Sequence, residues 1–88
     1  MIKEIVRVTN KTGLHARPAS VLAKAVKQFH CVITLNYKGK AIKPYSAMAL
    51  LTAGIKANSQ IELICDGVDE KQAIAELKRL FAIGFGHD

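Results

Sequence analysis

Apolar residues recur along the chain with two periods, one typical of strands and one typical of helices. In residues 2–9, Val6 and Val8 alternate with Ile5, Arg7 and Thr9, which is the two-residue period of a half-buried strand. In residues 16–28, apolar side chains recur three and four positions apart, as on the buried face of a helix. The pattern therefore predicts a strand that is followed, after a polar turn, by a helix.

The next elements follow from the same periods and from turn residues. They are, in chain order, strands over residues 32–37 and 40–43, a short helix over residues 47–53 and a strand over residues 60–65. Gly39 falls in the turn of the hairpin. Gly54 follows the short helix at the position where a left-handed residue is favoured, so we expect that helix to end there.

A last helix is predicted to begin after Asp69, which we interpret as its N-cap. Gln72 stands three residues further along, which is the spacing of a capping box. The apolar stripe of this helix consists of Ala73, Ile74, Leu77, Leu80 and Phe81.

The element order βαββαβα predicts an α+β fold, an open-faced sandwich. Three helices would cover one face of a four-stranded, mainly antiparallel sheet. The other face would carry polar residues such as Arg7, Thr34, Asn36 and Glu62. At 88 residues, the chain is expected to form a single domain over residues 1–88 with one modest core.

Composition narrows the class of protein. No apolar run approaches the ~20 residues that a membrane-spanning helix needs, and residues 1–4 begin no signal peptide. We therefore expect a cytoplasmic protein without membrane insertion. Cys31 and Cys65 each continue an alternating apolar set, so they are interpreted as small core residues rather than as a disulfide.

The chemistry of the chain centres on the run Gly13-Leu14-His15-Ala16-Arg17-Pro18-Ala19-Ser20. His15 lies at the junction of a loop and a helix, where backbone N–H groups without intrahelical partners favour an anion. Arg17 adds a permanent planar cation, and Pro18 is tolerated in a first turn. A neutral imidazole in this place is a candidate nucleophile for a phosphoryl group.

Residues 13–19 resemble the active-site signature of HPr, the histidine-containing phosphocarrier of the bacterial phosphoenolpyruvate-dependent phosphotransferase system. Ser46, Gly54 and Gly67 also stand at the family's spacing, so the resemblance covers nearly the whole chain. It implies the strand order 1-4-2-3. It also implies that His15 accepts a phosphoryl group from enzyme I and donates it to enzyme IIA proteins for sugar uptake, with Arg17 stabilising the phosphate.

Two surfaces near His15 are candidates for partner docking. A basic stripe on the first long helix continues outward from His15 and would attract an acidic partner. The short helix is apolar nearly all round, so with Leu50 and Ala53 turned inward some apolar side chains stay outside. The predicted docking residues are Ala16, Arg17, Ser20, Lys24 and Lys27 on the first helix and Ala47, Met48 and Leu51 on the short helix.

Ser46 has two interpretations. The resemblance implies that HPr kinase/phosphorylase modifies the matching serine in Gram-positive relatives, but of the surrounding residues only Met48 fits that regulated pattern. Physically, a serine before a helix is a good N-cap. We favour the structural cap.

The output pathway also has two interpretations. Ala49-Leu50-Leu51 and the run Leu80-Phe81-Ala82-Ile83-Gly84-Phe85 resemble the HPr-like protein of the nitrogen-related phosphotransferase system. That branch would keep the His15 chemistry and serve regulation in place of sugar uptake.

Other classes fit the sequence poorly. A basic nucleic-acid-binding sheet would stack bases on aromatic residues, but the chain has no tryptophan and no alternating aromatic pair on a strand. His15, His30 and His87 lack the spacing of metal ligands, so neither a metal nor another cofactor is expected. No nucleotide-binding loop accompanies His15, which predicts a carrier that depends on partner enzymes rather than an enzyme.

Overall fold

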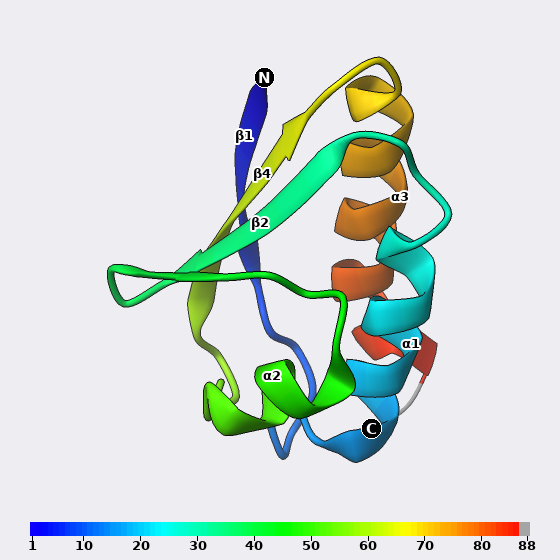
Figure 1. Cartoon of the computed structure of the whole chain (residues 1–88). Helices are drawn as coiled ribbons and strands as arrows, with labels where there is room; N and C mark the ends of the chain where they lie inside the picture. The colour runs from blue at the N-terminus through cyan, green and yellow to red at the C-terminus, as the bar shows by residue number, and fades with distance from the viewer. Residues whose placement is uncertain (87–88) are drawn as a thin grey trace.

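The computed structural model describes residues 1–86, which form one antiparallel sheet and three α-helices (Figure 1). The sheet has the strand order β1-β4-β2-β3. The strands are β1 (Ile2–Arg7), β2 (Val32–Tyr37), β3 (Lys40–Ile42) and β4 (Gln60–Asp66). The helices are α1 (Ala16–Val26), α2 (Ala47–Thr52) and α3 (Glu70–Ala82), and a 3-10 turn, η1 (Gly84–Gly86), follows them. The predicted order of elements and of strands is confirmed.

The core lies between the sheet and the helices. Alternation along β4 turns Ile61, Leu63 and Cys65 toward the helices, and all three are fully buried. Leu22 and Val26 of α1 meet them from the helical layer and are likewise fully buried. Figure 1 shows α1 and α3 side by side on this face of the sheet. Each large apolar side chain buried here contributes about 1.5–3 kcal/mol.

The opposite face of the sheet is uncovered, as predicted, but it is not uniformly polar. Arg7 is exposed and Glu62 is half-buried, in agreement with the pattern. Ile5 and Val32 lie on the same face and are 59% and 54% exposed. This face therefore mixes charged and apolar side chains.

Several elements differ from the prediction at their ends. β1 ends at Arg7 rather than at residue 9, because Val8 exchanges backbone hydrogen bonds with the loop residues Asn58 and Ser59 in place of a strand. α1 ends at Val26 rather than at residue 28, because Gln28 closes a tighter turn by donating to the carbonyl of Ala25.

The other changes are of one residue. β4 runs on to Asp66, because that residue pairs with Val32. β3 ends at Ile42 and α2 at Thr52, one residue earlier than predicted. Gly54 has the expected left-handed conformation, with φ of 65°.

The capping box predicted for the last helix is wrong. Asp69 occupies the N-cap position of α3, but its carboxylate makes no bond to that helix. It accepts hydrogen bonds from the backbone N–H groups of His30 and Cys31, both at 2.8 Å. The loop before β2 has unpaired N–H groups that compete for this carboxylate, and Gln72 stays exposed. Asp69 thus fixes the loop between α1 and β2.

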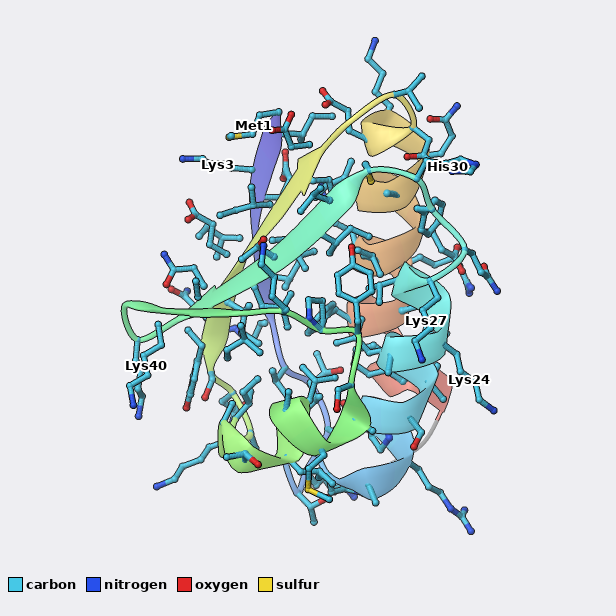
Figure 2. The ribbon with its side chains drawn as sticks, viewed as in Figure 1. Met1, Lys3, Lys24, Lys27, His30 and Lys40 are labelled. Atoms are coloured by element: carbon cyan, nitrogen blue, oxygen red, sulfur yellow. The ribbon has the colours of Figure 1, made fainter. Side chains whose placement is uncertain are left out.

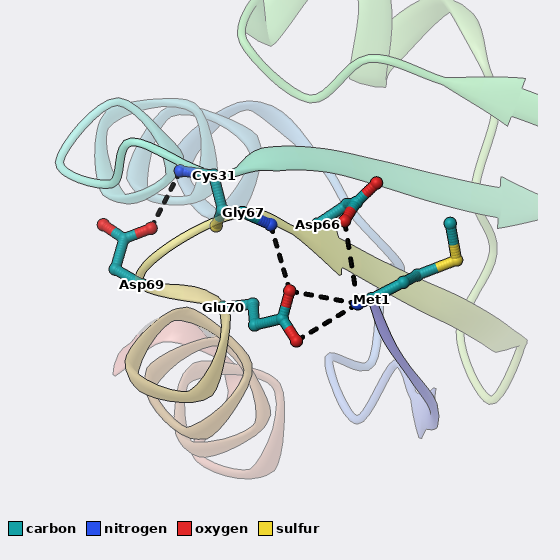
Figure 3. Close-up of polar contacts among 6 residues, drawn as sticks. All are labelled: Met1, Cys31, Asp66, Gly67, Asp69 and Glu70. Atoms are coloured by element: carbon teal, nitrogen blue, oxygen red, sulfur yellow. Dashed lines mark hydrogen bonds and ion pairs between the residues drawn. The ribbon is translucent and has the colours of Figure 1, made fainter.

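Glu70 performs a similar task at the same end of the sheet (Figure 3). Its carboxylate accepts from the backbone N–H of Gly67 at 3.0 Å and lies 3.1 Å from the ammonium group of Met1. Gly67 itself packs tightly, because a Cβ there would stand 2.6 Å from the Cα of Cys31. The β4–α3 turn is therefore held by side chains on both of its sides.

Cys31 and Cys65 are buried thiols in the core, as predicted. Burial raises the pKa of the Cys31 thiol to about 12, and burial also raises the pKa of Cys65. A thiol with so high a pKa forms little thiolate, which fits packing rather than reactivity.

The turn η1 was not predicted. Phe85 adopts a left-handed conformation with φ of 58°, and its ring meets Phe81 edge-on at a centroid distance of 4.8 Å. Gly84 accepts a hydrogen bond of 2.8 Å from the side-chain amide of Asn10. The contact closes the fold by joining the loop after β1 to the end of α3. His87 lies outside the described residues.

Gly13 sets the point at which α1 begins. Its φ is +75°, and a Cβ at this position would stand 2.5 Å from the carbonyl oxygen of Ile55. The next residue, Leu14, donates its N–H to that same oxygen at 3.0 Å. Only a glycine allows the β1–α1 loop to approach the α2–β4 loop this closely.

We predict that Asp69→Asn alters the acid stability of the protein. Hydrogen bonds from the backbone of His30, and then of Cys31, hold the pKa of the Asp69 carboxyl below its ordinary value of 3.8. A depressed pKa gives stability that is present above the unfolded value and is lost as the pH falls through the folded one. The variant should have a lower free energy of unfolding at neutral pH and a flatter decline in acid, measured by urea unfolding over a pH series.

The control for this change is Asp66→Asn, which removes a nearby carboxylate that is 57% exposed. It should keep the steep acid decline of the wild type. Equal acid profiles for Asp69→Asn and the wild type would contradict the role given to Asp69.

We also predict that Gly13→Ala destabilises the protein by about 3 kcal/mol, because strain of the left-handed backbone adds to the clash with Ile55. The matched control is Gly39→Ala. Gly39 has φ of +80°, but a Cβ added there would meet no other atom within 4 Å, so only the backbone strain of about 1–2 kcal/mol remains. Chemical denaturation measures both, and equal losses would show that the close approach to Ile55 is unimportant.

Candidate functional site

His15 is the N-cap residue of α1, with an extended backbone at φ −86° and ψ −166°. Its imidazole does not cap the helix. The ring is half-buried, and its Nε2 atom is fully buried with no hydrogen-bond partner in the described part of the chain. The Nε2 side of the ring is therefore closed to solvent in this structure.

The first backbone N–H groups of α1 directly follow His15 in the chain. The first hydrogen bond of α1 runs from the N–H of Ala19 to the carbonyl of His15 at 2.9 Å. The N–H groups of Ala16 and Arg17 precede it and have no partner among residues 1–86, whereas Pro18 has no N–H to offer. Two unpaired donors at a helix N-terminus form a ready site for an anion.

The charges around this helix end are positive. Arg17 is exposed, and the first turn of α1 holds no acidic residue that would neutralise it. The helix dipole adds about 0.3–1 kcal/mol in favour of an anion. The guanidinium can also form paired hydrogen bonds with phosphate oxygens.

The position of the loop that carries His15 depends on two residues that the sequence did not mark as part of the site. Asn10 was interpreted only as part of a polar turn, but it is 1% exposed and anchors the loop before His15 to Gly84. The backbone carbonyl of Ile55, in the α2–β4 loop, accepts a hydrogen bond from the N–H of Leu14. These partners lie far away in the chain, so no local signal marks them.

The first predicted docking surface lies on α1. Ala16, Arg17 and Ser20 are exposed, and so are Lys24 and Lys27 further along the helix. Figure 2 shows Lys24 on α1 and Lys27 at its C-cap. Every predicted residue of this docking surface is thus exposed, from the residue after His15 to the C-cap of α1.

The second predicted docking surface lies on α2, which packs beside α1. Met48 is 69% exposed and Leu51 is 39% exposed, whereas Leu50 is fully buried, as expected from the pattern. Ala47 departs from the prediction. It is half-buried and packs against the core, because it stands three residues before the buried Leu50 and so shares that face of α2. Met48 and Leu51 therefore carry most of the exposed apolar surface.

Ser46 stands at the N-cap of α2. Its hydroxyl oxygen accepts a hydrogen bond of 3.3 Å from the N–H of Ala49, and its backbone is extended, as an N-cap requires. The side chain is also exposed. This hydrogen bond is the N-cap contact that the structural interpretation of Ser46 predicts.

Two observations bear on other kinds of site. In the part of the chain that the structure describes, no three histidine, cysteine or acidic residues gather where they could hold a metal ion. No helix within residues 1–86 is long and apolar enough to cross a lipid bilayer.

Comparison with known proteins assigns the chain to a family. The model of the family "PTS HPr component phosphorylation site" matches residues 2–82. The phosphocarrier protein HPr of Buchnera aphidicola is 35% identical over 79 residues, which cover 90% of this chain and 93% of the relative. The phosphocarrier protein HPr of Treponema pallidum is 33% identical over 81 residues, which cover 92% of this chain and 92% of the relative.

A solved structure extends the match to the fold. The crystal structure of an HPr from Thermoanaerobacter tengcongensis superimposes with a TM-score of 0.93 at 31% identity, covering 100% of this chain and 99% of the other. The family model, the relatives and the fold agree with the resemblance carried by residues 13–19. The chain belongs to the HPr family, the phosphocarrier proteins of the phosphotransferase system.

Proposed function

We propose that His15 carries the phosphoryl group on Nδ1, receiving it from a phosphorylated enzyme I and passing it to an enzyme IIA protein. The observation that carries this proposal is the asymmetry of the ring, in which Nε2 is buried and the two open N–H groups of α1 lie beside the residue. Tightly packed loops hold the ring in this orientation before any partner arrives.

The transfer needs a simple exchange of bonds. The lone pair of Nδ1 attacks phosphorus in line with the donor, the bond from phosphorus to the donor breaks, and the electron pair returns to the donor. The N–H groups of Ala16 and Arg17 and the Arg17 guanidinium bind the phosphoryl oxygens as their charge shifts. The partner brings donor and acceptor into line, so the protein acts as a carrier and not as a catalyst.

Partner docking is proposed for the exposed stripe of α1 and the apolar residues of α2. The lysines Lys24 and Lys27 attract an acidic surface, and Met48 and Leu51 bury apolar area once contact is made. Both surfaces border His15, which leaves the phosphoryl site at the centre of the contact.

His15→Ala should abolish phosphoryl transfer without unfolding the protein, because only the nucleophile is lost. The measurement is intact mass after incubation with phosphoenolpyruvate and enzyme I, which reports one acid-labile phosphoryl group. His30→Ala is the matched control, since His30 is an exposed histidine outside the site, and it should be labelled normally. Normal labelling of His15→Ala would end the proposal.

The same assay separates the two pathways. Enzyme I of the sugar type and enzyme I of the nitrogen-related type are supplied separately. Faster labelling by the sugar type supports sugar uptake, and faster labelling by the nitrogen-related type contradicts it and assigns the carrier to regulation.

Arg17→Ala should slow the transfer about tenfold while leaving the fold intact, because it removes one charge-assisted contact to the phosphoryl oxygens. Rapid-quench measurement of the labelling rate tests this. Lys71→Ala, which removes an exposed charge on α3, should retain the wild-type rate. An unchanged rate for Arg17→Ala would contradict a role of Arg17 at the phosphoryl group.

For Ser46 we propose the role of helix cap. Ser46→Ala should lose about 1 kcal/mol of stability, measured by urea unfolding, because the N–H of Ala49 loses its acceptor. Ser46→Asp should retain the stability, since a carboxylate also caps a helix. Incubation with HPr kinase/phosphorylase and ATP should incorporate no phosphate, and incorporation at Ser46 would favour regulation.

A further inference from the structure

The side of β3 that faces away from β2 pairs with no other strand within the described residues. β3 is the last strand in the order β1-β4-β2-β3, and only β2 pairs with it. A two-residue turn, Lys38 and Gly39, joins the two strands, with positive φ values of 51° and 80°. In such a hairpin the flanking pair, Tyr37 and Lys40, exchanges both backbone hydrogen bonds.

The pairing fixes which backbone groups face outward. Ala41 stands opposite Asn36 in the next pair, which in an antiparallel ladder exchanges no backbone hydrogen bonds. The N–H and C=O of Ala41 therefore point away from β2. They have no hydrogen-bond partner in the described part of the chain. A second extended chain could use both groups at once.

A groove lies beside this edge, between β3 and α2. Its volume is about 640 Å³, which is within the range of clefts that bind ligands. The apolar part of its wall consists of Ala41, Ile42, Met48, Ala49 and Ala53. An unpaired strand edge next to an apolar groove and a helix is the arrangement in which domains accept an extended peptide as an added strand.

The charges at the groove are all of one sign. Lys40 and Lys43 line it, and no acidic residue does. The Nζ atom of Lys43 donates only to the hydroxyl of Thr34, at 3.0 Å, and Lys40 enters no ion pair within residues 1–86. Figure 2 shows Lys40 beside the hairpin, across the molecule from Lys24. A ligand at this edge must bring negative charge.

A second copy of the chain does not fit this requirement. It would bring the same lysines to the contact, and the two chains would each carry a net charge of +6. Lysines at a strand edge oppose self-pairing for this reason. They do not oppose a strand that carries carboxylates.

We propose that the edge of β3 and the groove beside α2 bind an extended acidic segment of a partner protein as a fifth strand of the sheet. The segment pairs with the open N–H and C=O of Ala41. Alternate side chains enter the groove against Ala49 and Ala53, and its carboxylates meet Lys40 and Lys43. Ser46 and Met48 also line the groove, so a bound segment lies next to the α2 surface.

The probe is a peptide of about six residues that alternates valine and glutamate, acetylated at its start and amidated at its end. Its binding is followed by amide chemical shifts of the labelled protein. We expect saturable binding with the largest shifts at Ala41, Lys43 and the residues of the groove. The same peptide with N-methyl groups on alternate residues cannot pair along one edge, and it should bind at least about tenfold more weakly.

Variants of the protein test each part of the contact. Ala41→Pro removes the outward N–H without breaking a bond to β2, and it should weaken binding about tenfold. The double variant Lys40→Glu with Lys43→Glu should abolish binding, whereas Lys71→Glu, the control on α3, should bind as the wild type does. The charge variants keep the test valid even if Ala41→Pro fails to fold.

Three results would overturn the proposal. They are equal binding of the N-methylated peptide, equal binding by the charge-reversed variant, and shifts located away from β3 and α2. Dimerisation through β3 in sedimentation experiments would also overturn it in favour of a second copy. His15→Ala should bind the peptide normally, which keeps this test independent of phosphoryl transfer.

Discussion

The backbone contact between two loops fixes the position of His15, the residue at which we propose that phosphoryl transfer takes place. Leu14 donates its N–H to the carbonyl of Ile55, and Gly13 passes that same carbonyl at a distance that no side chain permits. This contact fixes the residue at which α1 begins. Because His15 is the N-cap of α1, the position of the imidazole relative to the open N–H groups of the first turn follows from it.

The rest of the fold supports this loop contact from behind. Asn10 ties the loop before His15 to Gly84, and Phe85 packs edge-on against Phe81 to hold that last turn in place. At the other end of the sheet, Asp69 secures the loop that leads into β2. Side chains thus brace the loops at both ends, while the apolar layer between sheet and helices supplies most of the stability.

The functional groups divide between two regions of the surface. His15 lies at the N-terminus of α1, the exposed lysines lie toward the other end of that helix, and α2 adds exposed apolar side chains beside it; together they form the docking surface that we propose. The edge of β3 is a separate feature with open backbone groups and two lysines. α2 borders both regions, because Met48 belongs to the proposed docking surface and also lines the groove.

The sequence by itself determined the elements, the buried stripes and the candidate chemistry at His15, because periodicity and helix-end signals act over a few residues. It predicted the capping by Asp69 wrongly, because local rules cannot rank a distant backbone partner against a near one. Strand order came from the family resemblance and not from periodicity. Only the tertiary structure decided which ring nitrogen of His15 is buried, how Asn10 and Ile55 hold its loop, and which groups of β3 remain open. The physical reason is that burial and backbone pairing depend on residues that are close in space and distant in sequence.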